Sequence, residues 1–320
     1  MRGKRPIRIG TRGSRLALGQ AEQVASEWKR AYPDWEVSLV RIRTQGDLFT
    51  EASFLQMGGR GLFVKEIEEA LLAGRIDLAV HSMKDLPTEL PPGLCIGAIT
   101  FRQDPRDCLL SREGASLEEL LPGARIGTSS LRRQAQLRHF RPDLRIQPLR
   151  GNLDTRIRKL TSEGLDAIIL AAAGLHRLGM ADRISEYLSP EICLPAAGQG
   201  CLGVEVREED QELREAIRIL HHEESAEEVL AERAFLRGLG GGCQIPIGVL
   251  ARVEGEDLHL WGMVCDPEGK RRVGEDATGS AREAERLGEE LAARIRPLAQ
   301  EILQGGRLEE VKREGQGKGS

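Results

Sequence analysis

The chain has 320 residues, of which 40% are hydrophobic, 30% are charged and 3% are aromatic, and its net charge is −4. This length predicts about two domains or three small ones, and the few aromatic side chains argue against stacking platforms for nucleic-acid bases. The acidic balance excludes a global nucleic-acid footprint, whereas local clusters of arginine favour a pocket for a small polyanion.

No apolar run approaches the roughly 20 residues that cross a bilayer, and the start of the chain leads into a strand rather than a signal-peptide core. The six cysteines are widely scattered without a C-x-x-C pair, which fits neither a zinc knuckle nor a disulfide framework. The adjacent His221 and His222 lack the shared-face spacing of metal ligands. We therefore expect a cytoplasmic protein with no metal and no membrane partner.

A strand, a turn and a helix open the chain and recur in its second half. Residues 7–9 predict a strand, residues 11–14 a turn, and apolar side chains at helical spacing over 16–28 a helix that a proline ends. The Arg-Ile-Gly-Thr that spans this strand and turn returns at 125–128, before another small polar turn and a helix over about 131–139. Two halves of the chain therefore share one plan.

The segment over residues 44–61 shows no sustained period and closes with glycines. Loops of this length are often lids over a site, and an ordinary surface insertion is the alternative interpretation. If the segment is a lid, Gly58, Gly59, Arg60 and Phe63 are its candidate residues.

A second correspondence supports the repeat and also shows where the halves differ. Residues 77–82 and 166–171 are both buried-strand patterns that end in small side chains. Beyond the first strand come Lys84 and Asp85, whereas the second copy has an alanine and a glycine in their place. Only one half is therefore equipped with a charged pair.

Both repeated turns are predicted to lie where parallel sheets bind ligands. Strands that alternate with helices predict parallel sheets, and their ligands sit beyond the carboxyl ends of the strands, near helix N-termini. Arg12, Arg132 and Arg133 add positive charge there, together with serine and threonine hydroxyl groups. A double arginine is usually a solvated helix face, but its position directly after Gly-Thr-Ser-Ser favours anion binding.

The third region has a different pattern. A helix over 226–236 precedes two strands of a hairpin, at 247–253 and 258–264, and a third strand is expected before a helix over 287–302. These elements predict a small α+β domain, and the glycine-rich, charged residues after it predict a disordered tail.

Cys243 ends a run of three glycines, and no neighbouring residue offers it a metal or a disulfide partner. Glycines leave room for a bulky group close to the backbone, so the run suits a chain that carries something on this sulfur. The alternative is a flexible linker with a chance cysteine.

Seven motifs, taken together and in order from about Ile7 to the C-terminal helix, closely resemble the porphobilinogen deaminase family, also called hydroxymethylbilane synthase. They are Thr11-Arg12-x-Ser14, Gly58-Gly59-Arg60-Gly61-Leu62-Phe63, His81-Ser82-Met83-Lys84-Asp85-Leu86-Pro87, Asp104-Pro105-Arg106-Asp107, Gly127-Thr128-Ser129-Ser130-Leu131-Arg132-Arg133, Leu149-Arg150-Gly151-Asn152 and Gly241-Gly242-Cys243-Gln244-x-Pro246. The chain departs from the family at Arg60 and near Gln56, where lysines are common.

The resemblance implies a transferase of tetrapyrrole and heme biosynthesis that condenses four porphobilinogen molecules head to tail, releases ammonia and yields hydroxymethylbilane. It also implies a dipyrromethane cofactor on Cys243, attached through a thioether and used as a primer. The extended chain would carry roughly a dozen carboxylates, which need fixed cations because unpaired charges are costly to desolvate.

The resemblance further implies roles for individual residues. Asp85 matches the catalytic acid, for which an ion pair with Lys84 and a helix N-cap are the alternative interpretations. The cofactor positions are Cys243, Lys84, Asp85, Ser129, Arg132 and Arg133. The substrate positions are Arg12, Ser14, Thr128, Ser130, Arg150, Arg156 and Arg177.

The expected fold is α/β, with two lobes like those of periplasmic binding proteins, each built on a doubly wound, mostly parallel sheet. A small C-terminal α+β domain with a three-stranded antiparallel sheet completes it. We expect domain 1 at 1–100 and 201–218, domain 2 at 101–200, domain 3 at 219–304 and a tail at 305–320. The protein is expected to be monomeric, and the rival functions are a non-catalytic bilobed anion-binding module and an RNA-binding protein.

Overall fold

The computed structural model of the protein describes residues 6–44, 64–240 and 245–316, with side chains to residue 302. The chain forms two compact units. Unit 1 comprises Met1–Pro105, Ala171–Arg183 and Gly198–Ala226, and unit 2 comprises Arg106–Leu170, Ile184–Ala197 and Glu227–Ser320. The chain therefore passes repeatedly between the units, and each is described by itself.

Unit 1 is built on a five-stranded sheet of order β2-β1-β3-β10-β4. Strand β1 pairs in parallel with β2 and β3, whereas β10 pairs antiparallel with β3 and β4. The sheet is therefore mixed, and its fourth strand comes from a part of the chain far beyond the other four. The strands are β1 (Ile7–Thr11), β2 (Val37–Arg41), β3 (Leu78–Ser82), β4 (Leu94–Ile99) and β10 (Leu202–Arg207).

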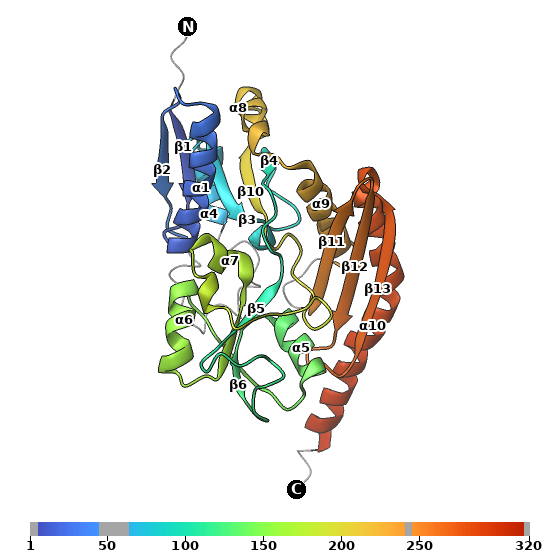
Figure 1. Ribbon diagram of the computed structural model, residues 1–320. Helices are drawn as coiled ribbons and strands as arrows, with labels where there is room; N and C mark the ends of the chain where they lie inside the picture. Colours follow the sequence, from blue (N-terminus) through green and yellow to red (C-terminus); the bar gives the residue numbers. More distant parts are fainter. Residues whose placement is uncertain (1–5, 45–63, 241–244, 317–320) are drawn as a thin grey trace. The chain divides into compact units, whose positions relative to one another are not determined.

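Helices cover both faces of this sheet (Figure 1). Helix α1 (Arg15–Ala31) buries Ala21, Val24 and Trp28 against one face, and Ser14 caps it by accepting a hydrogen bond from the Ala17 N–H. Helix α4 (Lys65–Leu72) packs on β3, β4 and β10. Since side chains alternate along a strand, β3 and β10 offer their even-numbered residues to the α1 side and their odd-numbered residues to the α4 side.

The remaining elements of unit 1 are short. The 3-10 turn η1 (Met83–Asp85) follows β3 directly, and α7 (Ala172–Arg177) and η2 (Ala181–Arg183) come from the second passage of the chain. Helix α8 (Gln211–Ala216) and the turn η3 (Ile217–Leu220) follow β10.

Unit 2 contains a second five-stranded sheet of order β7-β6-β8-β5-β9. Strand β6 pairs in parallel with β7 and β8, and β5 pairs antiparallel with β9, so this sheet is also mixed. The strands are β5 (Asp107–Ser111), β6 (Arg125–Gly127), β7 (Arg145–Gln147), β8 (Ala167–Ala171) and β9 (Glu186–Tyr187), and the helices are α5 (Leu131–Phe140) and α6 (Leu153–Ser162).

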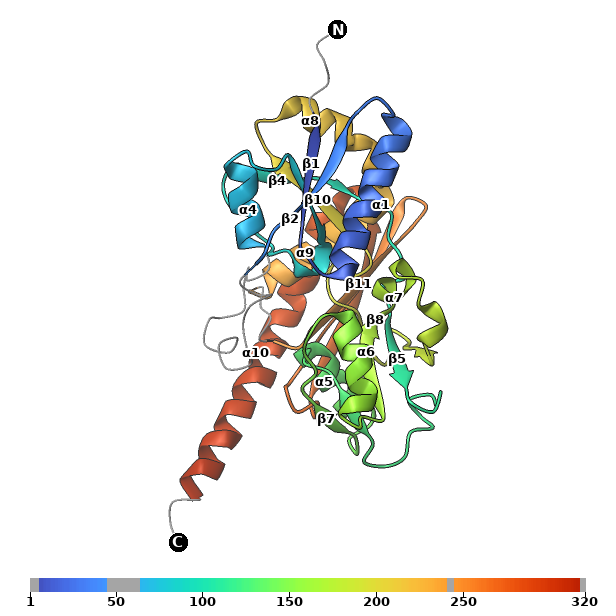
Figure 2. The same cartoon turned by 90° about the vertical axis from the view of Figure 1, so that its left-hand side faces the viewer.

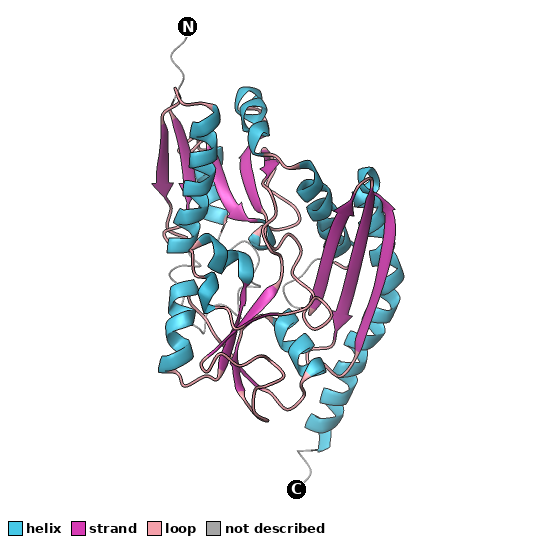
Figure 3. Ribbon diagram, in the orientation of Figure 1, coloured by secondary structure: helices cyan, strands magenta, loops and turns pink. Residues whose placement is uncertain are grey.

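The last part of unit 2 is a three-stranded antiparallel sheet of order β11-β12-β13. Helix α10 (Ala284–Gln316) packs on β12 and β13, and Figure 2 shows that it continues beyond the end of the sheet. The strands of this sheet are β11 (Ile247–Glu254), β12 (Asp257–Cys265) and β13 (Arg272–Ser280), and Figure 3 shows them as long arrows. Between β13 and α10 lies the short turn η4 (Ala281–Glu283).

The edge strand β11 is covered by helix α9 (Glu223–Gly238). The Ala251 N–H donates to Glu232 Oε1 at 2.8 Å, and the Val253 N–H donates to Glu228 Oε1 at 3.3 Å. An edge strand otherwise presents unpaired N–H groups to other chains. The two glutamates therefore accept hydrogen bonds from two N–H groups of this edge strand and fix the helix to it.

The α/β prediction and the three-stranded antiparallel C-terminal sheet are confirmed. The structure differs from the expected disordered tail, because α10 continues to Gln316. Leucine, glutamate, lysine and arginine follow the glycines there, and these are strong helix formers. No helix among the described residues is long and apolar enough to span a membrane.

Candidate functional site

The charged pair after β3 lies on a single 3-10 turn. Lys84 and Asp85 are the second and third residues of η1, and the Leu86 N–H closes the turn by donating to the Met83 carbonyl. Asp85 is exposed and has no hydrogen bond or ion pair to any described residue. The carboxylate is therefore neither paired with Lys84 nor used as a helix cap in the part of the chain that the structure describes.

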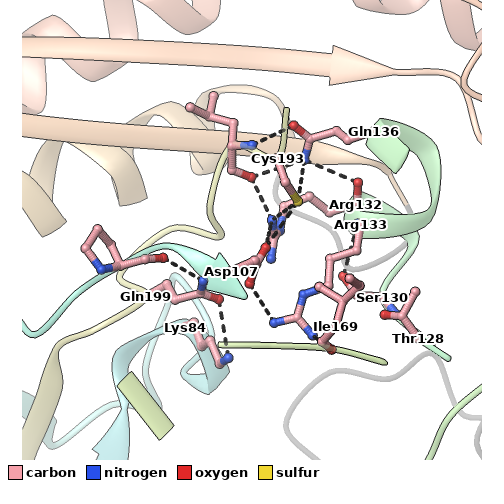
Figure 4. Close-up of polar contacts among 12 residues, drawn as sticks. Lys84, Asp107, Thr128, Ser130, Arg132, Arg133, Gln136, Ile169, Cys193 and Gln199 are labelled. Atoms are coloured by element: carbon pink, nitrogen blue, oxygen red, sulfur yellow. Dashed lines mark hydrogen bonds and ion pairs between the residues drawn. The ribbon is translucent and has the colours of Figure 1, made fainter. Parts of the chain in front are cut away.

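A loop from the third passage of unit 1 fixes this turn. Lys84 Nζ donates to Gln199 Oε1 at 3.4 Å (Figure 4). The Met83 N–H donates to the Cys201 carbonyl at 3.1 Å. Gly198 has φ +71°, and a Cβ there would lie only 2.7 Å from Met83 Cβ. The loop therefore approaches the turn as closely as a glycine allows.

Gln199 itself is buried and held on both sides. The Gln199 side-chain Nε2 donates to the Pro105 carbonyl at 2.7 Å, and the Gln199 backbone carbonyl accepts from Arg102 Nε at 3.0 Å. The sequence analysis missed this residue. The available signal was its position between two glycines, which marks a tight backbone approach.

The loop after β1 brings Arg12 and Ser14 to the same edge of the sheet. Thr11 Oγ1 donates to the Ala17 carbonyl at 3.0 Å, and Ser14 caps α1, so the loop is tied to the first turn of the helix. Because β1 and β3 are parallel neighbours, the loops that follow them share one edge. Gln20 Nε2, on α1, donates to Ser82 Oγ at the end of β3 at 3.0 Å.

Arg177 is a largely buried cation on α7. Its Nη2 donates to the Gly200 carbonyl at 2.6 Å, and its buried Nε has no partner among the described residues. Burial lowers the pKa of the guanidinium to about 10, so it remains charged at neutral pH. Buried N–H groups normally find an acceptor, so the Arg177 Nε is a candidate donor to a bound anion.

In unit 2, hydroxyl groups gather between two parallel strands. The Leu149 N–H donates to Ser129 Oγ at 3.0 Å and Ser129 Oγ donates to the Leu149 carbonyl at 3.1 Å, which joins the loops after β6 and β7. Ser130 caps α5, and its own N–H donates to Thr128 Oγ1 at 3.3 Å. These three residues, predicted as anion ligands, lie together at the carboxyl ends of β6 and β7.

Arg150 and Arg156 flank the neighbouring helix N-terminus. Asn152 caps α6 by accepting from the Thr155 N–H, and Arg156 Nε donates to the Gly151 carbonyl at 2.8 Å. Gly151 has φ +113°, which only glycine adopts readily. The loops after β6 and β7 therefore lead into two helix N-termini, with Arg150 before α6 and Arg156 in its first turn, an arrangement suited to carboxylates.

Arg132 and Arg133 are buried, and both pair with Asp107 (Figure 4). Arg132 Nη1 lies 2.6 Å from Asp107 Oδ2, and Arg133 Nη2 lies 2.7 Å from Asp107 Oδ1. Burial alone would raise the pKa of Asp107, but the two guanidinium groups outweigh it and hold the pKa well below its usual range. The carboxylate is therefore always ionised at physiological pH.

The remaining bonds of these arginines go to the backbone. Arg132 Nη1 also donates to the Leu194 carbonyl at 2.6 Å, and Arg133 Nη1 donates to the Ile169 carbonyl at 3.0 Å. Arg133 Nε is buried without a partner among the described residues, and no bond of Arg132 to them uses its Nε or Nη2. Asp107, whose role the sequence analysis did not identify, thus orients both side chains. Arg132 and Arg133 still have N–H donors that no described residue uses.

The predicted lid residues Gly58, Gly59, Arg60 and Phe63, the departure at Gln56, and Cys243 lie outside the described residues. Over the rest of the chain no cluster of three or more His, Cys, Asp or Glu side chains could hold a metal ion. His221 Nδ1 instead accepts from the Ile99 N–H, and His222 Nδ1 accepts from the Ser225 N–H.

Two family models match the chain. "Porphobilinogen deaminase, dipyromethane cofactor binding domain" matches residues 7–215, and "Porphobilinogen deaminase, C-terminal domain" matches residues 226–296. The porphobilinogen deaminase of Pelobacter propionicus is 52% identical over 96% of this chain and 97% of its own length. That of Pelotomaculum thermopropionicum is 51% identical over 96% of this chain and 99% of its own.

Solved structures give only distant matches. The second substrate-binding domain of a putative amino acid ABC transporter from Streptococcus pneumoniae aligns with TM-score 0.42 and 13% identity, over 74% of this chain and 95% of that one. The periplasmic aliphatic sulphonate-binding protein from Escherichia coli aligns with TM-score 0.40 and 14% identity, over 74% of this chain and 75% of that one.

Proposed function

Because the chain belongs to the porphobilinogen deaminase family, we propose which of its residues carry the family's reaction. The protein is a transferase that joins four porphobilinogen molecules head to tail, releases ammonia at each addition and yields hydroxymethylbilane. Its cofactor is a dipyrromethane attached to Cys243. When bound, this group supplies the pyrrole carbon to which the first substrate unit is joined.

The donor set of the described residues fits such a group. Pyrroles with acetate and propionate side chains need cations and hydroxyl donors, and an anion-binding surface normally combines guanidinium groups with helix N-termini. The Nε atoms of Arg133 and Arg177, which have no partner among the described residues, are donors of this kind. We assign Lys84, Ser129, Arg132 and Arg133 to the cofactor, with Asp107 holding the two arginines in place.

The other cations and hydroxyl groups are assigned to the carboxylates of substrate and growing chain. Arginine suits this role because two parallel hydrogen bonds orient a carboxylate as well as neutralise it. Several of these side chains already make one backbone bond, which lowers the conformational entropy lost when an anion binds. The assigned residues are Arg12, Ser14, Thr128, Ser130, Arg150, Arg156 and Arg177, and Gly58, Gly59, Arg60 and Phe63 are assigned to a lid.

Asp85 is assigned the catalytic role. Loss of ammonia from porphobilinogen develops positive charge that the pyrrole nitrogen shares, and a fixed carboxylate beside that N–H stabilises the charge as it forms. The same group can accept and return a proton. The observation that carries this assignment is an exposed carboxylate, unpaired with any described residue, on a turn that Gln199 and Gly198 hold in place.

Replacement of Asp85 tests the assignment. Asp85→Asn keeps the shape and removes the charge, so we expect kcat to fall by at least about 100-fold, in the range typical of lost acid–base or electrostatic catalysis. Glu89→Gln, an exposed carboxylate four residues further on, is the matched control and should keep normal activity. The intact mass of each variant must be measured alongside its activity, because a chain that lacks the dipyrromethane adduct is inactive whatever the role of Asp85.

A near-normal yield of hydroxymethylbilane from the Asp85→Asn chain would remove the proposed catalyst. Intact mass also tests the attachment site: Cys243→Ser should lack the adduct, whereas Cys95→Ser should keep it.

We also propose that the enzyme is a cytoplasmic monomer without a nucleic-acid partner. The proposal is supported by the scattered cysteines, the net charge of −4 and the aromatic content of 3%. Light scattering of the purified chain and binding of polynucleotide at low salt would test it. A stable dimer or steeply salt-dependent polynucleotide binding would contradict it.

A further inference from the structure

A buried imidazole and a buried carboxylate meet on the α4 side of the unit 1 sheet. In the antiparallel pair of β3 and β10, His81 lies opposite Gly203 and Glu205 lies opposite Ala79, so both side chains project from the same face. His81 Nε2 and Glu205 Oε2 are 2.9 Å apart, and the side chains are 5% and 0% exposed. Neither residue belongs to the assigned site.

A second carboxyl group approaches this pair from α4. Glu68 is 7% exposed, and its helix contacts both β3 and β10. Burial, and then the charge of Glu205, raise the pKa of Glu68 to about 7, although His81 opposes the shift. Oε1 of Glu68 and Oε1 of Glu205 are both buried without a hydrogen-bond partner among the described residues.

Among the described residues, no charged group other than His81 lies within ion-pair distance of Glu205, and none lies within that distance of Glu68. Arg207, at the end of β10, instead donates to the carbonyls of Leu71 and Ile76 and pairs with Asp210. The remaining ionisable residues on α4 and on β1, β3 and β4, which it contacts, are Lys65, Glu66, Glu69, Arg8 and Cys95, and Asp77, just before β3, pairs with Arg8. The buried group of His81, Glu205 and Glu68, here the buried trio, thus carries more acid than base.

The buried trio lies directly behind the turn that carries Asp85. His81 is followed by Ser82 and then by Met83, the first residue of η1. The Met83 side chain fills the space above Gly203, where a Cβ would lie 2.4 Å from Met83 Sδ, and Gly203 is the pairing partner of His81. A shift of the imidazole would therefore be passed to the first residue of the turn.

Stability alone gives a poor account of the buried trio, because well-packed apolar residues often replace buried ionic groups without loss. We propose that His81, Glu205 and Glu68 form a positioning unit, in which the imidazole–carboxylate hydrogen bond fixes the end of β3 and a negative charge on the buried Glu68 would weaken that arrangement. This inference rests on the proposed role of Asp85. The three residues act through the turn and do not touch the substrate.

Three polar substitutions test the positioning unit, with kcat and KM measured from pH 6 to 9. Glu205→Gln and His81→Gln weaken the central hydrogen bond, and we expect kcat to fall about tenfold while KM changes little, because none of the residues assigned to the substrate lies on the turn η1. Glu68→Gln imitates the protonated acid and should keep kcat near the wild-type value at pH 6. The exposed Glu69→Gln, one residue along α4, is the matched control.

The pH profile supplies a readout that a merely structural role would not change. In the wild type, Glu68 loses its proton as the pH rises through about 7, so a second negative charge appears beside Glu205 and kcat should decline. In Glu68→Gln this decline should be absent, and Glu69→Gln should retain it. Intact mass confirms that each chain carries the same adduct, and urea unfolding confirms that each is folded.

The inference is overturned if Glu205→Gln has a normal kcat, or if Glu68→Gln and Glu69→Gln have the same pH profile. Should Glu205→Gln fail to fold, the Glu68→Gln profile decides alone. Asp85→Asn is measured in parallel to separate the two proposals. A normal kcat for Asp85→Asn would remove the proposed catalyst, whereas a large loss there together with unchanged trio variants would refute only the positioning unit.

Discussion

At the scale of single residues, one buried carboxylate orients both of the arginines assigned to the cofactor. Asp107 takes a bond from each guanidinium through a different oxygen, so neither arginine can turn without losing its charge partner. Cys193 Sγ also lies 3.3 Å from Asp107 Oδ2, and burial raises the pKa of this thiol to about 12, so it stays protonated. The cluster of Arg132, Arg133 and Asp107 therefore has a net positive charge, and the orientation of both guanidinium groups is fixed.

Replacement of Asp107 by a neutral side chain should destabilise unit 2. Asp107→Asn leaves two buried cations with no ionised partner, so we expect the free energy of unfolding to fall by about 3–5 kcal/mol. Urea denaturation at pH 7 measures the loss. The control is Asp143→Asn, which breaks the more exposed pair with Arg141 and should cost far less. Equal losses in the two variants would contradict the role given to Asp107.

The contribution of Asp107 to the free energy of unfolding should also depend on pH. The folded-state pKa of Asp107 is depressed, so its contribution to stability is complete above the unfolded-state value of about 4 and declines as the pH falls below it. We expect the stability difference between the wild type and Asp107→Asn to be constant from pH 5 to 8 and to shrink below pH 4. A difference that grew on acidification would have the wrong sign.

At the scale of elements, the turn η1 is held by a loop that reaches it from far along the chain. The loop can approach because Gly198 has no side chain and adopts φ +71°. Gly203, on β10, makes equal room for the Met83 sulfur. The position of Asp85 is thus set by two glycines as well as by hydrogen bonds.

Adding one methyl group should displace this turn. In Gly198→Ala the new Cβ would lie 2.7 Å from Met83 Cβ, so the turn or the loop must move, and we expect kcat to fall about tenfold, or roughly 1.4 kcal/mol of transition-state stabilisation. Gly179→Ala separates strain from collision, because Gly179 has φ +66° but nothing within 4 Å of its Cβ position. It should lose roughly 1 kcal/mol of stability and no activity. Equal kcat values in the two variants would refute the steric argument.

At the scale of the whole molecule, the sequence predicted what depends on local periodicity. The helix after Ser14 and the helix after Ser130 begin at the residues that the turns indicate, because a capping hydroxyl and an apolar stripe are both local signals. The hairpin of β11 and β12 was found for the same reason: alternating strands flank a Glu-Gly-Glu-Asp turn.

Contacts between distant segments were not predictable in this way. Gln199 and Lys84 are 115 residues apart, and Glu205 and His81 are 124 apart, so no period or motif links them. The mixed character of the unit 1 sheet has the same origin, since β10 enters antiparallel between β3 and β4. Asp107 stood within a recognised motif, but only the folded chain shows that it faces Arg132 and Arg133.

The cofactor should also contribute to the stability of the enzyme as a whole. Lys84, Arg132 and Arg133 are the cations proposed to bind the cofactor, and the carboxylates of the loaded group can pair with them only in the folded state. We therefore expect Cys243→Ser, which cannot carry the adduct, to unfold several degrees below the loaded wild type. Thermal unfolding followed by circular dichroism measures the difference.

Salt distinguishes this electrostatic explanation from a packing effect. Interactions among partly exposed charges are screened at high ionic strength, so the gap between Cys243→Ser and the loaded wild type should narrow from 0.05 M to about 0.5 M sodium chloride. Cys95→Ser, which alters a half-buried thiol in unit 1, should unfold at the same temperature as the loaded wild type at both concentrations. A gap that did not change with salt would assign the stabilisation to apolar contacts of the pyrrole rings, and the absence of any gap would contradict the linkage between the primer and the fold.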